Sequence, residues 1–197
     1  MTERPYHHGN LRRALLDAAE RTVRERGVQE LSLRELAREV GVSHGAPRRH
    51  FPDRQALLDA LAESGFERLR RELSAASDDA GDAFEDRLRA IAAAYISFAA
   101  EVPALLELMF AGKYSDESDA LEAAAERAFA VMLDVIAQGQ AEGRIEPGDP
   151  ERVGFVLFAT IQGIASLRAS GMVPAEQLDE LLTDAIVHFL RGSRSAV

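Results

Sequence analysis

The sequence predicts an all-α protein of about nine helices, and three features of the chain support this. Apolar residues recur at the three- and four-residue spacing of amphipathic helices along almost the whole chain. Glycine and proline fall where these segments end, and runs that alternate apolar and polar residues, as strands do, are missing. Helices are expected over residues 11–26, 32–40, 43–51, 54 to beyond 69, 83–101, 103–111, 116–142, 151–169 and 174–191.

Short signals set the limits of the first helices. Gly27 and Gly41 end the first two, because glycine readily adopts the left-handed conformation of a helix C-terminus. Ser32 begins the second, with Glu35 three residues on, which is the S-x-x-E spacing of a capping box. The small and acidic residues SAASDDAGD predict a loop over 74–82.

Composition excludes several classes of protein. Of the 197 residues, 47% are apolar, enough to bury a core, but no apolar run approaches the roughly 18 residues that span a bilayer. The N-terminus shows no signal peptide, so the cytoplasm is the expected compartment. The chain has no cysteine and lacks phosphate-binding and H-E-x-x-H motifs, so we expect no metal, no cofactor and no enzyme activity.

The net charge of −10 is unevenly distributed. Residues 1–60 carry 11 arginines against 9 acidic residues, a net charge of +2, and the remainder of the chain carries −12. A weakly basic head suits nucleic-acid binding, because two copies of it would add their charge on one face. An ordinary protein surface would give the same distribution, so charge alone does not decide between the two.

Two short helices that meet at Gly41, Val42 and Ser43 have the form of a helix-turn-helix. Gly41 can take the positive φ of the turn, Val42 can fill the angle between the helices, and Ser43 can cap the second helix. That second helix would be the recognition helix, which lies in the major groove of DNA. Helix corners that bind no DNA use the same pattern, so the turn leaves both interpretations open.

The side chains after the turn suit contact with DNA. Residues 44–46, His-Gly-Ala, offer an imidazole for a base edge and two small side chains that let the backbone approach. Residues 48–50, Arg-Arg-His, can reach phosphates or guanine. Pro47 has no N–H to donate, so either the helix begins a residue later or one of its hydrogen bonds is missing.

From residue 11 to residue 61 the chain reads LRRALLDAAERTVRERGVQELSLRELAREVGVSHGAPRRHFPDRQALLDAL. The segments LSLRELAREVGVS and RHFPDRQALL, in this order and spacing, resemble the N-terminal region of tetracycline-repressor-like (TetR/AcrR) regulators. The resemblance covers residues 9–69. It implies a DNA-binding head over 9–69 with three helices and a helix-turn-helix, and a helical domain for ligand binding and dimerisation over 70–197.

The implied protein is a homodimer that represses transcription at a near-palindromic operator and is released by a small-molecule effector. The last two helices would pair with those of a partner chain, although their apolar stripes could instead pack within one chain. One stripe includes Val156, Ile164 and Leu167, and the other includes Leu182 and Ile186. A regulator that responds to a protein partner or to no effector remains an alternative, as does an activator.

The resemblance also implies roles for single residues. Ser32 and Arg54 would contact phosphates, and His50 would contact the DNA backbone. Arg48 stands where the family usually has tyrosine, so its contact could be a phosphate or a guanine. The predicted DNA-binding residues are Ser32, Ser43, His44, Gly45, Ala46, Arg48, Arg49, His50 and Arg54.

Most of the aromatic residues lie between Phe84 and Phe158. Each could belong to the core, but together they could line an apolar cavity with few polar groups, as ligand sites do. Such a cavity would prefer an uncharged or weakly charged lipophilic molecule. The predicted pocket residues are Tyr95, Phe98, Phe110, Tyr114, Phe129, Phe158 and Gln162.

Overall fold

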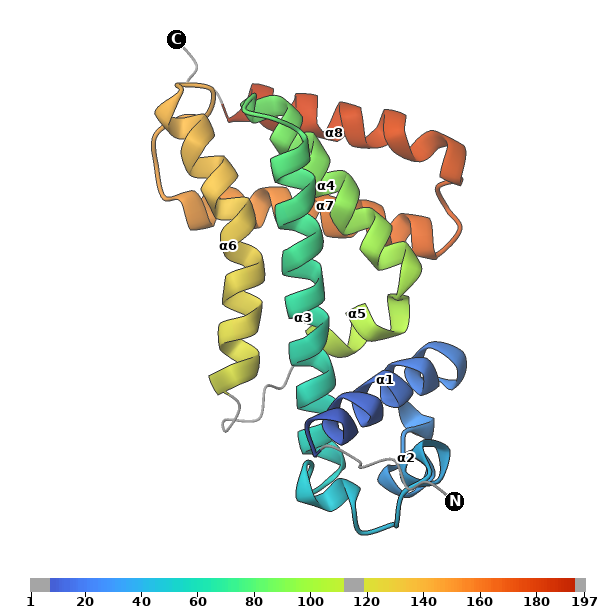
Figure 1. Ribbon diagram of the computed structural model, residues 1–197. Helices are drawn as coiled ribbons and strands as arrows, with labels where there is room; N and C mark the ends of the chain where they lie inside the picture. The colour runs from blue at the N-terminus through green and yellow to red at the C-terminus, as the bar shows by residue number, and fades with distance from the viewer. Residues whose placement is uncertain (1–7, 112–118, 194–197) are drawn as a thin grey trace. The chain divides into compact units, whose positions relative to one another are not determined.

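The computed structural model of the chain describes residues 8–111 and 119–193 (Figure 1). The α-helices are α1 (His8–Arg26), α2 (Leu33–Val40), α3 (Arg54–Asp79), α4 (Phe84–Glu101), α5 (Pro103–Phe110), α6 (Asp119–Ala141), α7 (Pro150–Ala169) and α8 (Leu178–Gly192). Three short 3₁₀ helices accompany them: η1 (Val28–Glu30), η2 (Pro47–Arg49) and η3 (Ala175–Gln177). The all-α prediction is confirmed.

Within these described ranges no single helix is long and apolar enough to cross a membrane. Helices α4 and α5 together reach the necessary length and apolar composition, but only as a pair with a sharp bend between them.

The described residues form eight α-helices, and the missing one is the recognition helix expected over 43–51. The chain forms a turn there and then η2, in which the His50 N–H donates to the Pro47 carbonyl at 2.9 Å. Pro47 explains the difference, because it cannot donate the first hydrogen bond of an α-helix that Ser43 would cap. The expectation of a regular α-helix in this segment is therefore wrong.

One compact unit, the N-terminal unit, consists of Met1–Gly65 and Ala104–Glu122, and the remaining residues form the C-terminal unit. Within it α1 packs against α2 and η1, and α2 packs against η2. Its most deeply buried large side chains are Leu15, Leu36, Phe51, Leu57, Leu61 and Met109. These apolar residues hold the helix-turn-helix elements together, so the polar residues between them are free to face outward.

The other compact unit consists of Phe66–Pro103 and Ala123–Val197. In it α4 packs against both α7 and α8, which also contact each other. The predicted loop over 74–82 is wrong over residues 74–79, because α3 continues to Asp79. Ser77 is only 2% exposed, and its hydroxyl accepts a hydrogen bond from Arg87 Nε at 2.8 Å, so tertiary contacts carry the helix through this polar stretch.

Gly41 ends α2 as predicted, with φ 77°, and provides a test of the turn. We expect Gly41→Ala to lower the free energy of unfolding by about 1–2 kcal/mol, because a Cβ strains left-handed backbone. Gly45→Ala is the matched control, since the φ of Gly45 is not positive and a Cβ at this residue would point into open space. This substitution should cost less than about 0.5 kcal/mol. Urea unfolding measures both, and equal costs would contradict the assignment.

Candidate nucleic-acid interface and ligand site

Residues 43–51, the recognition segment, contain both buried residues that anchor the segment and exposed polar residues. Pro47 and Phe51 are buried, and Phe51 is among the most enclosed side chains of its unit. Between and before these anchors, the exposed residues are Ser43, His44, Gly45, Arg48 and Arg49, and Ala46 and His50 are half-buried. The residues predicted to touch DNA thus include two exposed arginines on a 3₁₀ turn whose two ends are fixed in the core.

Ser32 is the N-cap of α2, as predicted, but its side chain makes no capping hydrogen bond. The predicted capping box with Glu35 is therefore wrong. The Ser32 carbonyl accepts the Leu36 N–H at 3.0 Å, while the hydroxyl takes no part in the helix. The Ser32 hydroxyl is consequently available to an external acceptor such as a phosphate oxygen.

Arg54 makes contacts that the sequence did not indicate. Its Nε donates to the Leu31 carbonyl at 3.1 Å, and its Nη2 donates to the Val28 carbonyl at 2.6 Å. These bonds join the start of α3 to the connector between α1 and α2. A sequence motif cannot show that an arginine will bond to backbone carbonyls more than twenty residues away. Only the tertiary structure could therefore reveal that Arg54 holds this connector.

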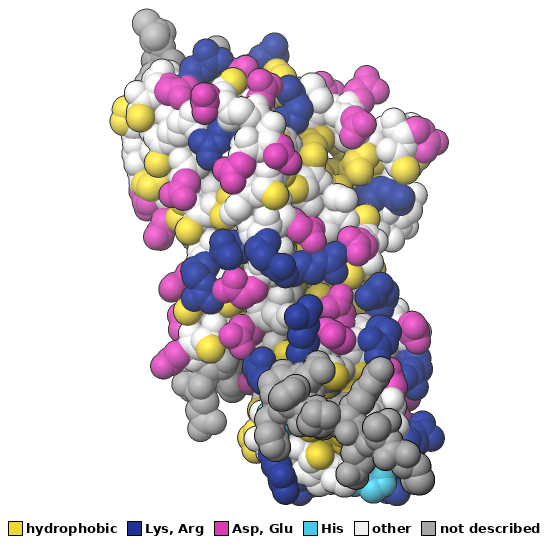
Figure 2. Space-filling view, viewed as in Figure 1, with side chains coloured by type: hydrophobic (Ala, Val, Ile, Leu, Met, Phe, Trp, Pro, Cys, Tyr) yellow, Lys and Arg dark blue, Asp and Glu magenta, His cyan; other side chains and the backbone are white. Residues whose placement is uncertain are grey.

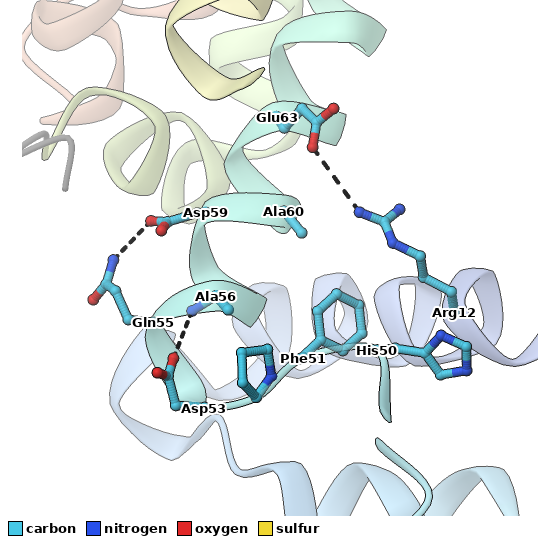
Figure 3. A pocket seen from close by; sticks show the side chains of 10 residues that line it. Arg12, His50, Phe51, Asp53, Gln55, Ala56, Asp59, Ala60 and Glu63 are labelled. Carbon is cyan, nitrogen blue, oxygen red and sulfur yellow. Dashed lines mark hydrogen bonds and ion pairs between the residues drawn. The ribbon is translucent and has the colours of Figure 1, made fainter. Parts of the chain in front are cut away.

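A groove of about 360 Å³ runs beside the first turns of α3 (Figure 3). The Arg12 guanidinium lies over the Phe51 ring, 5.5 Å from its centroid, and 4.0 Å from Glu63 Oε2. His50 lines the same groove, as Figure 3 shows. Arg12 therefore adds a cation beside the recognition segment that sequence reasoning did not single out.

Charged side chains cover both units (Figure 2). In this view Lys and Arg side chains are interspersed with Asp and Glu side chains and with hydrophobic side chains. Several arginines of the N-terminal unit form ion pairs, such as that of Arg21 with Glu39 at 2.8 Å. The excess of basic charge on this unit is consequently small, so the positions of individual arginines matter more for DNA binding than its net charge.

Four of the predicted pocket residues come together in the C-terminal unit. The Tyr95 hydroxyl donates to Gln162 Oε1, and its ring meets Phe158 edge-on at 5.5 Å. Phe129 meets Phe158 edge-on at 6.1 Å and stacks on Phe155 at 4.9 Å. Burial raises the pKa of the Tyr95 hydroxyl, so this group stays neutral at physiological pH. The aromatic cluster, defined by Tyr95, Phe129, Phe155, Phe158 and Gln162, is thus apolar with one neutral polar pair.

The other predicted pocket residues lie elsewhere. Phe98 is 0% exposed and lies beneath the guanidinium of Arg68, which is 5.3 Å from the ring centroid. Phe110 lies on α5, which belongs to the N-terminal unit, and is exposed. Tyr114 lies outside the described residues.

The C-terminal half of α3 is tied to two neighbouring helices by ion pairs. Arg68 bonds to Glu101 of α4 and to Glu72, each at 2.8 Å. Glu67 accepts from Arg127 of α6, with Nε at 2.9 Å, and from Arg70 at 3.2 Å. The bonds from Arg127 and Arg70 lower the pKa of Glu67, so its contribution to stability is present at neutral pH and lost as the pH falls through the lowered pKa.

The last two helices expose only part of the stripes predicted for pairing. Ile164 and Leu182 are 5% and 4% exposed and lie inside their own chain, so their assignment to a pairing stripe is wrong. Val156 and Leu167 of the predicted α7 stripe are exposed, at 57% and 38%, as is the neighbouring Phe155 at 58%. The exposed α7 face, defined by Val156, Ala159, Gly163 and Leu167, follows helical spacing and borders a hollow of about 460 Å³ lined by Phe155 and Arg152.

Comparisons with known families cover most of the chain. The family described as bacterial regulatory proteins, tetR family, matches residues 15–61. The family described as tetracyclin repressor-like, C-terminal domain, matches residues 88–189. The two matches cover the recognition segment and the aromatic cluster respectively.

Individual proteins agree with this. A nucleoid occlusion factor SlmA from Edwardsiella ictaluri is 30% identical over 84% of this chain and 86% of its own length. A solved structure of a protein with unknown function from Rhodococcus sp. RHA1 is 47% identical, with a TM-score of 0.89 over 98% of this chain and 100% of that chain. The transcriptional regulator FadR from Bacillus subtilis, solved in complex with stearoyl-CoA, is 15% identical, with a TM-score of 0.74 over 91% of this chain and 98% of that chain. At that identity the likeness to FadR concerns the fold.

Proposed function

Because the chain belongs to the tetR family of bacterial regulatory proteins, whose members are DNA-binding transcriptional regulators and not enzymes, we propose that it is a dimeric repressor released by a small lipophilic effector. It would act on the chromosome, in the cytoplasm. The observation that carries the DNA-binding part is the pair of exposed arginines, Arg48 and Arg49, on a turn anchored by buried Pro47 and Phe51. A rigid base lets such side chains meet DNA without a large loss of entropy.

Selection from random duplexes tests the DNA-binding part. The protein should enrich a near-palindromic site whose half-sites lie about one helical turn apart. Arg49→Ala should weaken binding to every duplex, and the slope of log affinity against log salt should shrink by about 0.9, as expected when one phosphate contact is lost. Arg48→Ala should do the same if Arg48 binds phosphate, or lose about 1–3 kcal/mol of discrimination at one base if it reads guanine. Failure to enrich any sequence would contradict the proposal.

The aromatic cluster supports an uncharged lipophilic effector. It offers three aromatic rings beside a Tyr95–Gln162 pair that is neutral at physiological pH, so a charged ligand would lack a partner there. The stearoyl-CoA bound by FadR has an apolar acyl chain that matches this chemistry, whereas its charged coenzyme A part does not. Thermal shift against a panel of fatty acids, their esters and other lipophilic compounds tests the proposal. A hit should raise the unfolding temperature of the wild type and not that of Phe158→Ala.

α3 would transmit the effector signal. Phe98 and Tyr95 lie on the same helix, α4, and the Phe98 ring touches Arg68 on α3. A ligand that repacks the aromatic cluster could therefore shift α3 through Arg68. The shift can be no larger than the difference in the ligand's affinity for the two states. The alternative is a regulator that responds to a protein partner or to no effector; the relative SlmA is named a nucleoid occlusion factor and not a ligand-binding protein.

A further inference from the structure

We infer that Arg54 is a positioning residue for DNA binding: it holds the connector between α1 and α2, and so fixes Ser32 where a phosphate can meet it. The inference rests on the proposed DNA binding. It differs from the role that the family resemblance implies, in which Arg54 itself contacts phosphate.

The contacts of Arg54 favour the connector. Nε and Nη2 donate to the carbonyls of Leu31 and Val28 at 3.1 and 2.6 Å. A guanidinium presents these donors in a fixed planar fork, so holding both carbonyls also fixes the direction of the remaining N–H groups. Hydrogen bonds from a charged donor are also about twice as strong as neutral ones.

The connector needs this support, because its own hydrogen bonds are long. The Glu30 N–H reaches the Gly27 carbonyl at 3.3 Å, and the Leu31 N–H reaches the Val28 carbonyl at 3.2 Å. Arg54 reinforces the second of these sites, since it donates to the same Val28 carbonyl. Without Arg54 the segment before α2 would keep its weak 3₁₀ turn, the packing of η1 against α1 and the burial of Leu31.

The backbone of Arg54 lies at the N-terminus of α3, which its neighbours hold in place. The Asp53 carboxylate accepts the Ala56 N–H at 2.9 Å and so caps the N-terminus of α3, as Figure 3 shows. Phe51, two residues earlier, is locked in the core. The start of α3 is therefore rigid, and the guanidinium transfers that rigidity to the connector.

Ser32 is where this support would matter for DNA. It directly follows Leu31, whose carbonyl Arg54 holds, and it is the N-cap of α2 with a hydroxyl that makes no capping bond. A displaced Leu31 carbonyl would turn the next peptide and carry the Ser32 hydroxyl with it. Losing Arg54 should consequently cost the Ser32 contact, which is uncharged, and leave the count of charged phosphate contacts unchanged.

A double-mutant cycle with Ser32 tests this on a duplex that the wild type enriches. Anisotropy titrations over a range of NaCl concentrations would compare the wild type with Arg54→Met, Arg54→Lys, Ser32→Ala and the combined variants. We expect Arg54→Met to bind roughly five- to tenfold more weakly, the weight of about one hydrogen bond. Arg54→Lys should lose nearly as much, because a single ammonium does not reproduce the fork. In the Ser32→Ala background either change should add less than about twofold, since both remove the same contact.

The salt slope separates positioning from direct contact. Arg49→Met, the control, should reduce the slope by about 0.9, and Arg54→Met should change it by much less. A loss of about 0.9 at Arg54 with binding retained in Arg54→Lys would overturn the inference in favour of a direct phosphate contact. Unchanged affinity, or a loss that simply adds to that of Ser32→Ala, would overturn it as well. If Arg54→Met does not fold by circular dichroism, the cycle with Arg54→Lys decides. If the wild type enriches no duplex, the proposed function fails before Arg54 is tested.

Discussion

Val156→Glu is expected to convert the proposed dimer to a monomer and to weaken operator binding by at least about a hundredfold. Val156 is 57% exposed in the single chain and lies on the exposed α7 face. Pairing that face with a second copy would bury the new carboxylate without a partner, which costs several kcal/mol. A monomer would hold one half-site and lose the gain of roughly 10²–10⁴ in affinity that joining two binding units gives. Light scattering and DNA titration measure the two effects.

Ala137→Glu is the matched control for this change. Ala137 is an exposed alanine on α6, so the substitution adds the same charge outside the α7 face. It should leave both mass and DNA affinity within about twofold, as surface substitutions do. A Val156→Glu protein that stays dimeric at micromolar concentration would contradict the α7 interface. Ile164→Glu cannot serve this purpose, because Ile164 is a core residue of its own chain and the variant would unfold.

Phe98→Ala is expected to lower the free energy of unfolding by about 3–5 kcal/mol, the cost of a large cavity in a packed core. The ring is 0% exposed, so not even a water-sized space adjoins it, and Arg68 covers one of its faces. Urea unfolding of the two proteins measures the difference. A loss below about 1.5 kcal/mol would mean that the surroundings already contain open space, as expected for a pocket-lining residue.

Phe155→Ala provides the comparison within the same unit. Phe155 is 58% exposed, and its ring stacks on Phe129 at 4.9 Å. Its removal in a monomeric variant should cost about 1 kcal/mol, the weight of one aromatic pair. The contrast between Phe98 and Phe155 distinguishes core from surface among aromatic residues that the sequence alone could not tell apart.

Local patterns in the sequence are enough to predict the helical fold, the family and the limits of most helices. Periodic apolar residues and well-placed breakers are local signals, so Gly41 and Pro103 mark a helix end and a helix start in the sequence as they do in the structure. Local residues also predict the recognition segment, and the missing N–H of Pro47 marks the place where the α-helix does not form. The sequence further indicated that Tyr95 and Gln162 would belong to one site, which their hydrogen bond supports.

Contacts between residues far apart in the chain become visible only in the folded protein. Helix periodicity gives apolar stripes on the last two helices but does not say which neighbour covers each residue. Their own chain buries Ile164 and Leu182, whereas Val156 of the same stripe as Ile164 stays exposed. The polar segment around Ser77 remains helical because Arg87, on the following helix, satisfies the buried hydroxyl. Arg54 acquires its role from two backbone carbonyls more than twenty residues away. Backbone carbonyls are identical at every residue, so contacts of this kind are set by the fold and cannot be read from a motif.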